Sequence, residues 1–470
     1  SFNTVLGFEA ASANTTGNEN TAVGHQAMLN NTIGSDGTAV GRAALASNTE
    51  GDFNTAIGFN SLYSNTTADG NTAVGLEAAY SNTTGANNVA LGRAALYDNS
   101  TGIQNTALGR SALENNTASN NVAVGYQAAY TNTTGSNNIA VGKQALYYNT
   151  TGASNAAVGH LALHQNTTGD DNTAVGLQAS YTQSGSAHSN TAIGRKSQFS
   201  TTTGNSNTSV GYNSLFYTTT GSDNAAVGNS ALQANTTGYE NTAIGRQALL
   251  SQTTAYRNTA IGNQAGANVT TGHNNVFIGY RTGNYSVNTT TGTSNTLVGN
   301  YLRSSSSSGG TSHGLGYDLS CAAGYTTLGN GTSDIRAQHG VATWSTVSDE
   351  RYKKDITDAT AGLSFINDLT PRTFKYKNLG ELPDTFESYK EGSTDVFKNN
   401  RTNHGFIAQE VKTAIDAHPE IKDGFTLWDD REDGSQEVAE AALIPVLVKA
   451  LQELSAKNDA LEARLTALEG

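Results

Sequence analysis

A strict period of seventeen residues is the strongest constraint on how this chain folds. An aliphatic residue followed by glycine recurs eighteen times, from Leu6-Gly7 to Val298-Gly299, within a unit that reads approximately N-T-A-V-G-x-x-A-L-x-x-N-T-T-G-x-x. The glycine of each pair is called the marker glycine below. Successive marker glycines are seventeen residues apart, except for sixteen before Gly125, eighteen before Gly194 and twenty before Gly299. Such a repeat predicts that each unit is one structural coil.

The residue types within one unit favour a mainly β fold. Seventeen residues are too few for a helical repeat, and Gly, Asn and Thr are poor helix formers. The segments 72–74 and 78–80 alternate as two short strands would, and Asn-Thr-Thr-Gly is typical of turns. We therefore predict a parallel β-solenoid, or β-roll, with two strands and two turns per coil. Eighteen coils stacked at about 4.8 Å would extend over roughly 80 Å.

The repeat supplies little material for a core. Each unit offers few apolar side chains, most often Ala, Val and Leu. Ordering all residues of one unit costs on the order of 25 kcal/mol, and burial of such small side chains at about 25 cal/mol per Å² barely offsets that cost. We therefore expect several copies of the chain to share a core along the axis.

Two side-chain ladders run through the repeat. The fifth residue after the marker glycine is often aromatic and could bind a glycan, or the rings could pack on one another: Tyr63, Tyr80, Tyr97, Tyr130, Tyr147, Tyr181, Phe199 and Phe216. A second ladder matches glycosylation sequons but is favoured as a set of turn-forming amides: Asn48, Asn65, Asn82, Asn132, Asn149, Asn166 and Asn235.

The composition changes sharply near residue 348. Residues 1–347 carry 26 charged residues, whereas residues 348–470 carry 39 charged residues and all four prolines. We predict a solenoid shaft at 1–303 and a separate domain at 348–470. Between them, residues 304–347 are expected to lose the period, with a flexible Ser/Gly run followed by a strand pair at 334–344 that forms a transition or a tip.

Several classes of function are disfavoured by composition. A net charge of −13 argues against nucleic-acid binding. The single cysteine, Cys321, excludes an internal disulfide framework, and the scattered histidines show no metal spacing, so neither a metal nor a cofactor is expected. No apolar run approaches the roughly 20 residues of a membrane span. No signal peptide is evident, although a chain without an initial Met can lack its true start.

The chain ends in a predicted helix with a heptad seam. Its inward positions alternate steps of four and three residues: Leu447, Leu451, Leu454, Asn458, Leu461, Leu465 and Leu468. A polar Asn458 at such a position is a common means of fixing register and oligomeric state. We expect this helix to form a coiled coil with copies of itself, and the alternative is a terminal helix packed on its own domain.

The repeats resemble the head repeats of trimeric autotransporter adhesins, whose Asn-Thr-Ala-Val-Gly-like units form a left-handed parallel β-roll. This resemblance makes three the favoured number of copies. Over this sequence, the chain departs from that family in unit length and in showing no C-terminal membrane anchor, so we do not expect a bacterial outer-membrane adhesin.

Residues 348–470 resemble the endosialidase-type intramolecular chaperone domain that ends bacteriophage tail fibres and tailspikes. Four motifs occur in order: S-D-x-R-x-K, then L-x-x-I-x-x-L-x-P-x-x-F-x-Y, then G-F-I-A-Q-E-V, and finally L-I-P-V-L-V-K-A-L-Q-E-L. The resemblance implies that the domain trimerises the chain, guides folding of the upstream β-structure and then cuts itself off.

The same resemblance implies the cleavage residues. Ser348 would be the nucleophile, Lys353 the general base, and Val347–Ser348 the bond that is cut. In a strand, Lys353 and Lys354 would face opposite sides, so only one could be the base. Asp349 and Arg351 are expected to be structural partners rather than catalytic groups.

These expectations combine into a homotrimeric fibre protein, most simply a bacteriophage tail fibre that is located in the virion. It would adhere to a receptor on a host surface, either a glycan or a surface protein, and its only enzymatic activity would be one self-cleavage. One alternative is an extracellular or cell-surface filament or adhesin that retains the domain. A second alternative is a glycan depolymerase tailspike. The low charge of the repeats argues against it, because few carboxylates are available for catalysis.

Overall fold

The computed structural model describes residues 2–284, 289–341, 343–346, 348–422, 425–431 and 433–469. The chain divides into two compact units, an N-terminal unit Ser1–Val347 and a C-terminal unit Ser348–Gly470.

The described strands of the N-terminal unit are β1 (Thr4–Leu6), β2 (Thr21–Val23), β3 (Thr38–Val40), β4 (Thr55–Ile57), β5 (Thr72–Val74), β6 (Val89–Leu91), β7 (Thr106–Leu108), β8 (Val122–Val124), β9 (Ile139–Val141), β10 (Ala156–Val158), β11 (Thr173–Val175), β12 (Thr191–Ile193), β13 (Thr208–Val210), β14 (Ala225–Val227), β15 (Thr242–Ile244), β16 (Thr259–Ile261), β17 (Val276–Ile278), β18 (Thr296–Asn300), β19 (Arg303–Ser304), β20 (His313–Tyr317), β21 (Ser320–Cys321), β22 (Tyr325–Asn330) and β23 (Ser333–Gln338).

The described elements of the C-terminal unit are η1 (Glu350–Tyr352), α1 (Leu363–Asp368), β24 (Arg372–Phe374), η2 (Leu379–Glu381), β25 (Asn403–Gly405), α2 (Ala408–Asp416), β26 (Trp428–Asp430), β27 (Gln436–Val438), η3 (Glu440–Ala442) and α3 (Leu443–Glu469).

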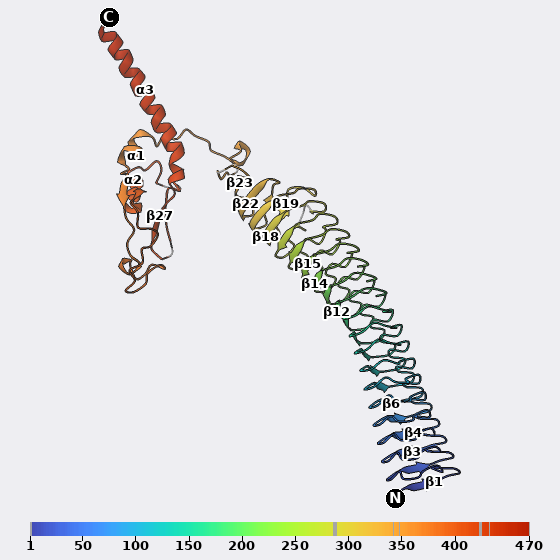
Figure 1. Cartoon of the computed structure of the whole chain (residues 1–470). Helices are drawn as coiled ribbons and strands as arrows, with labels where there is room; N and C mark the ends of the chain where they lie inside the picture. Colours follow the sequence, from blue (N-terminus) through green and yellow to red (C-terminus); the bar gives the residue numbers. More distant parts are fainter. Residues whose placement is uncertain are drawn as a thin grey trace. The chain divides into compact units, whose positions relative to one another are not determined.

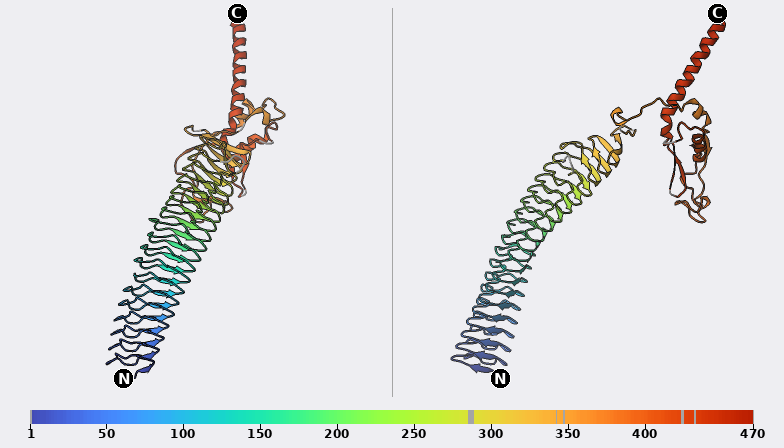
Figure 2. Two further views of the ribbon diagram at one scale, coloured as in Figure 1. Left: turned by 90° about the vertical axis from the view of Figure 1, so that its right-hand side faces the viewer. Right: turned by 180° about the vertical axis from the view of Figure 1, so that it is seen from behind.

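The N-terminal unit is a β-solenoid, as the period of the sequence predicts. Each marker glycine follows a short strand, and the strands of successive coils pair in parallel, so that Thr55 lies opposite Thr72 and Ile57 opposite Val74. Over the described residues this gives one 21-stranded sheet. Figures 1 and 2 show the strands stacked one above another along the unit. The predicted mainly β class and solenoid architecture are confirmed.

The prediction of a second strand in each coil is wrong. Residues 75–81 form turns rather than a strand, and Glu77 and Ala79 have φ values of 56° and 50°. The consecutive residues Ala78 and Ala79 are both buried, at 0% and 2% exposure, whereas a strand would send one of them outward. The left-handed backbone conformation of Ala79 lets both alanine side chains point into the interior, at a conformational cost of about 1–2 kcal/mol. The backbone still bonds to the next coil, because the Ala79 amide donates to the Ala95 carbonyl at 2.8 Å.

The interior of the solenoid closes within one chain. The central residue of each strand and the third and fourth residues after the marker glycine point inward, as with Ala56, Ser61 and Leu62, which are all fully buried. The core is thin but covered on all sides by its own coil. A neighbouring copy is therefore not needed to bury these inward side chains, and a further core shared between copies along the axis stays a prediction.

Two ladders of asparagine amides run through this interior. In the ladder identified from sequence, Asn82 Nδ2 donates to Asn65 Oδ1 at 2.9 Å and to the Gly85 carbonyl at 3.0 Å. A second ladder lies just before the strands, where the backbone N–H of Asn88 donates to Asn71 Oδ1 at 2.9 Å. Members of both ladders are almost fully buried. The interpretation as turn-forming amides is confirmed, and burial excludes these side chains as glycan acceptors.

The apolar interior is interrupted once along the described shaft. One core cluster ends at Ala192 and the next begins at Leu215. Between them Ser197, Ser209 and Ser214 replace alanine, with Oγ–Oγ distances of 2.6 Å from Ser197 to Ser209 and 2.5 Å from Ser209 to Ser214. This layer satisfies its hydroxyls only when these particular coils are stacked on each other.

The solenoid continues beyond residue 303, contrary to the expected loss of period. Strand β20 pairs in parallel with β18, and β22 pairs in parallel with β20. The signal was present in the sequence, because Leu315-Gly316 follows Val298-Gly299 after one full repeat length. The Ser/Gly run is part of the same coil, since the Ser307 carbonyl accepts a hydrogen bond from Thr290. Cys321 lies in this added core, and burial raises the pKa of its thiol to about 11.

An antiparallel strand ends the stack. The strand pair expected at 334–344 is formed instead by β22 and β23, with Leu328 opposite Ile335. The chain then returns along β23, where Arg336 and Ser345 exchange backbone hydrogen bonds of 2.9 and 2.7 Å. This arrangement covers the open edge of β22 with strands that cannot continue the parallel stack.

The C-terminal unit is a small α+β fold whose core is built around Phe365, Val411, Ile415, Leu427 and Leu443. Strands β24 and β25 form one antiparallel pair, and β26 and β27 form another. The first turns of α3 pack on this core, and the rest of the helix extends away from its own unit (Figures 1 and 2).

His418 joins two parts of the C-terminal unit. Its imidazole lies 2.8 Å from Asp368 at the end of α1 and 3.0 Å from Glu420, and its side chain is 11% exposed. The hydrogen bond to Asp368, and then that to Glu420, raises the pKa of His418 above its usual range. The charged imidazole therefore stabilises this unit.

Replacing Asn82 with Ala should lower the free energy of unfolding by about 2 kcal/mol, because the acceptors on Asn65 and Gly85 stay buried after their donor is removed. Denaturant unfolding followed by circular dichroism measures this change. Thr84→Ala, at an exposed position of the same turn, is the control and should be nearly neutral. Equal losses in the two variants would contradict a structural role for the ladder.

The C-terminal unit should lose stability as the pH rises from about 6.5 through the raised pKa of His418. A raised histidine pKa contributes its full stability below the unfolded value of about 6.5, and this contribution disappears as the pH rises through the folded value. In the full chain, Trp344→Phe leaves Trp428 as the only tryptophan, so its fluorescence reports the urea midpoint of this unit. His418→Gln should flatten the pH dependence, and an unchanged slope would refute the assignment.

Candidate functional site

The segment that carries the predicted cleavage residues is a short 3-10 turn rather than the expected strand. Asp349 caps η1 by accepting a hydrogen bond from the Arg351 amide at 2.9 Å, and it forms an ion pair of 2.6 Å with the Arg351 guanidinium. This contact holds the pKa of Asp349 below its usual range. Both residues thus have the structural role expected for them.

Ser348 and Lys353 lie on either side of this turn and meet. Lys353 Nζ donates a hydrogen bond to Ser348 Oγ at 2.9 Å. The backbone becomes extended again at Lys353, where φ is −115° and ψ is 150°, which allows its side chain to fold back over η1. Val347, on the other side of the predicted cleavage bond, lies outside the described residues.

This geometry fits a nucleophile and its base. A serine hydroxyl attacks a carbonyl only when a nearby group removes its proton, and a base must lie within about 2.6–3.2 Å of that hydroxyl. Lysine can act in this way once burial disfavours its charged form. In the single chain both Ser348 and Lys353 are exposed, so the arrangement has the right distance but lacks the cover that would activate it.

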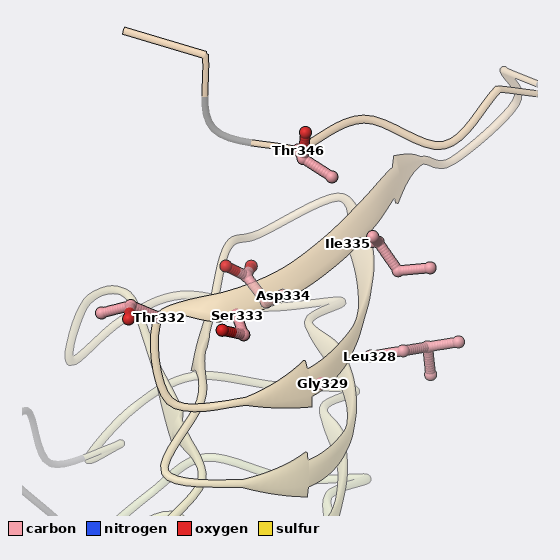
Figure 3. Close-up of a pocket in the computed structure, with 7 residues that line it drawn as sticks. All are labelled: Leu328, Gly329, Thr332, Ser333, Asp334, Ile335 and Thr346. Atoms are coloured by element: carbon pink, nitrogen blue, oxygen red, sulfur yellow. The ribbon is translucent and has the colours of Figure 1, made fainter. Parts of the chain in front are cut away.

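The capped end of the solenoid carries an open hollow. Its volume is about 550 Å³, and it is bounded by the β22–β23 hairpin and by Thr346 on the returning segment. Figure 3 shows Leu328 and Ile335 side by side, pointing the same way, and Asp334 and Ser333 on the other side of the hairpin. The hollow is thus apolar at one end and polar at the other.

An exposed aliphatic face runs along the sheet, and the sequence reasoning missed it. It consists of the third residue of β1–β18, which is always Val, Ile or Leu: Leu6, Val23, Val40, Ile57, Val74, Leu91, Leu108, Val124, Val141, Val158, Val175, Ile193, Val210, Val227, Ile244, Ile261, Ile278 and Val298. Typical members, such as Ile57 and Leu91, are 40% and 43% exposed. Contiguous exposed apolar surface of this extent marks an interaction site.

The aromatic ladder packs on itself. The rings of Tyr63 and Tyr80 are 5.1 Å apart and nearly parallel, and those of Phe199 and Phe216 have the same spacing. Within each stacked run, the ring faces that meet are covered by each other, so these faces are not available for stacking on a sugar. His164 occupies one position of this ladder, and burial lowers its pKa to about 4.

A carboxylate pair interrupts the ladder. Glu114 takes the place of a ring between Tyr97 and Tyr130, and it lies near Asp98. Burial and then the charge of Glu114 raise the pKa of Asp98. This perturbed pair was missed by the sequence reasoning, because it joins residues in neighbouring coils that are far apart along the chain.

The seam of α3 is largely unpaired in the single chain. Leu454, Leu461 and Leu465 are 53%, 60% and 60% exposed, whereas Leu443 and Val446 pack on their own unit. The helix therefore combines both alternatives considered from sequence: its start packs within the unit and its remainder presents an apolar stripe.

Among the described residues, no group of three or more His, Cys, Asp or Glu side chains could hold a metal ion. The described helices include none that is both long and apolar enough to cross a membrane.

Comparison with known proteins identifies part of the C-terminal unit. Residues 348–418, which include the Ser348–Lys353 contact, match the protein family described as the chaperone of endosialidase. Comparisons with curated proteins and with solved structures gave no match. The chain thus carries a chaperone-of-endosialidase domain after an N-terminal β-solenoid, a combination that fits a tail fibre with an endosialidase-type chaperone domain.

Proposed function

We propose that this chain is a homotrimeric fibre protein, a bacteriophage tail fibre of the virion that attaches to a host surface. The observation that carries the proposal is the aliphatic face, which follows the entire solenoid and is left uncovered by the chain itself. The chaperone-of-endosialidase match at residues 348–418 supports it, because a domain that guides folding would be expected to follow a repetitive shaft in the sequence.

A second copy of the same chain is the occupant that fits this face. The exposed side chains repeat with the period of the coils, so only a surface with the same spacing can cover all of them. The exposed seam of α3 points to the same partner, because seam positions pack into the matching seam of an identical helix. Three copies would bury both surfaces around one axis.

The Ser348–Lys353 contact supports a self-cleavage step. Lys353 Nζ, in its uncharged form, would take the proton of Ser348 Oγ as that oxygen attacks the carbonyl carbon of Val347, and would pass it to the amine nitrogen of Ser348 as the C–N bond breaks. This leaves an ester between Val347 and Ser348 Oγ, and hydrolysis of that ester by water would release the chaperone. Since both side chains are exposed in the single chain, the proposed activation depends on cover by neighbouring copies, and cleavage would follow assembly.

Adhesion is the role proposed for the released shaft, with a host glycan or surface protein as its receptor. A cell-surface or extracellular filament remains the alternative within the same architecture. The Asp98–Glu114 pair is the feature of the shaft that favours the depolymerase alternative, because burial and the nearby Glu114 raise the pKa of Asp98. Release of sugar from capsular polysaccharide, abolished by Glu114→Gln, would favour that enzyme over an adhesin.

Breaking the seam of α3 should prevent assembly. Leu454→Glu with Leu461→Glu places charges at two exposed seam positions, and light scattering should then report a single chain instead of three. Ala463→Glu, outside the seam on the same helix, is the control and should remain trimeric. A trimer from the seam variant, or a monomer from the unmodified chain, would contradict the proposed assembly.

Ser348→Ala and Lys353→Met should each keep the chain at full length, because one removes the nucleophile and the other the base. Mass spectrometry of the purified protein measures whether residues 348–470 are still attached. Lys354→Met is the matched control and should be cut like the unmodified chain. Cleavage at Val347–Ser348 in the Ser348→Ala variant would show that the dyad is wrongly assigned.

A further inference from the structure

The two long edges of the sheet carry opposite charges. The residue directly after each marker glycine lies at the C-terminal end of its strand, and in the eighteen units this position holds no carboxylate. It holds six exposed cations, here called the basic edge: Arg42, Arg93, Arg110, Lys143, Arg195 and Arg246. More than half of the 11 Lys and Arg residues of 1–347 therefore occupy one position of the repeat.

The acidic edge lies at the opposite end of the strands. The positions two and three residues before β1–β18 hold eight carboxylates and a single Lys or Arg, Arg257. The exposed members are Glu19, Asp36, Asp69, Asp171, Asp223 and Glu240, of which Glu240 is paired with Arg257 at 2.6 Å. Since every strand of the parallel stack runs in the same direction, the two signs stay on opposite edges along the shaft.

Each edge brings like charges together in adjacent coils. Arg93 and Arg110 occupy the same position in adjacent coils, and so do Asp52 and Asp69, each three residues before its strand. Like charges in register on neighbouring strands destabilise a sheet. The chain accepts this repulsion on both edges, which would be relieved by a surface of opposite sign.

We propose that the basic edge of one copy lies along the acidic edge of the next. This inference rests on the proposed homotrimer and names how its copies face each other. Rotation about an axis parallel to the shaft keeps all strands running the same way around that axis. The C-terminal strand ends of one copy then meet the N-terminal strand ends of its neighbour, in a head-to-tail interface that closes into a ring.

The aliphatic face and the charged edges therefore have separate tasks. The aliphatic face, lying between the two edges, supplies the area that is buried against other copies. The edges select the relative direction of the shafts, because opposed signs meet only in the cyclic arrangement and like signs repel in others. The partner recognised by each edge is a second copy of this chain.

Charge reversal on one edge tests the proposal in the full-length protein. Arg42→Glu with Arg246→Glu reverses two of the six charges on the basic edge. Asp36→Lys with Asp223→Lys reverses two carboxylates of the acidic edge that lie in the same or the neighbouring coils. At about 20 mM salt, each double variant should melt roughly 5 °C below the unmodified trimer. The variant with all four changes restores opposite signs and should recover most of the loss. At about 1 M salt, where the Debye length is about 3 Å, the differences should vanish.

The control introduces charge away from both edges. Thr84→Glu with Thr134→Glu adds two carboxylates at exposed turn positions in coils that are not adjacent and should melt close to the unmodified chain. If the double variants melt like this control, or if the fourfold variant is no better than either of them, the edge pairing is wrong. Light scattering on the unmodified chain separates this result from failure of the proposed function, because a single chain in solution would refute the trimer itself.

Discussion

The structure depends on the direct stacking of one coil's backbone on the next. At the marker glycines this approach leaves no room for a side chain: Gly75 has φ of 140°, and a Cβ there would lie 2.6 Å from the Gly92 carbonyl oxygen. The hydrogen bonds between coils require the same stacking at every level, as from Thr72 to the Asn88 carbonyl at 2.8 Å. The repeat units can therefore differ only in the side chains that they direct into the interior or toward solvent. Because equivalent residues of successive coils lie above one another, each such position forms a ladder along the stack.

The ladders differ in whether one chain can satisfy them. Inward positions are settled within the coil, since alanine and leucine fill the interior and the asparagine amides bond to one another, as Asn82 does to Asn65. The stacked rings of the aromatic ladder also cover each other. The aliphatic face and the charged edges are not satisfied within one chain. Along a single shaft the aliphatic side chains stay exposed, and the charges of each edge lie next to charges of the same sign. What the chain cannot satisfy alone is thus concentrated on the sheet, and this argues for partners there rather than at the turns.

The repetition of one strand in every coil could be predicted from the sequence, but the backbone path from one strand to the next could not. Ala78 and Ala79 look like an alternating pair, and only the closure of the coil turns both inward. The coil at 304–330 was missed although Leu315-Gly316 keeps the spacing, because the serine run obscured the rest of the unit. For the candidate site, resemblance supplied Ser348 and Lys353. Their approach across a 3-10 turn could not be read from the sequence, since the expected strand would place them differently.

In the proposed trimer, a repetitive shaft raises the question of how the copies align with one another. A shift by one coil leaves the aliphatic face nearly unchanged, since every coil presents Val, Ile or Leu there. The charged edges are less uniform, because Arg93 and Arg110 are adjacent whereas Arg195 and Arg246 are three coils apart. A sliding copy would thus lose some charge contacts but little apolar area. In the proposed trimer, alignment would therefore come from outside the solenoid repeat. The exposed seam of α3 can supply it, because Asn458 interrupts the leucines once and so distinguishes one register from the others.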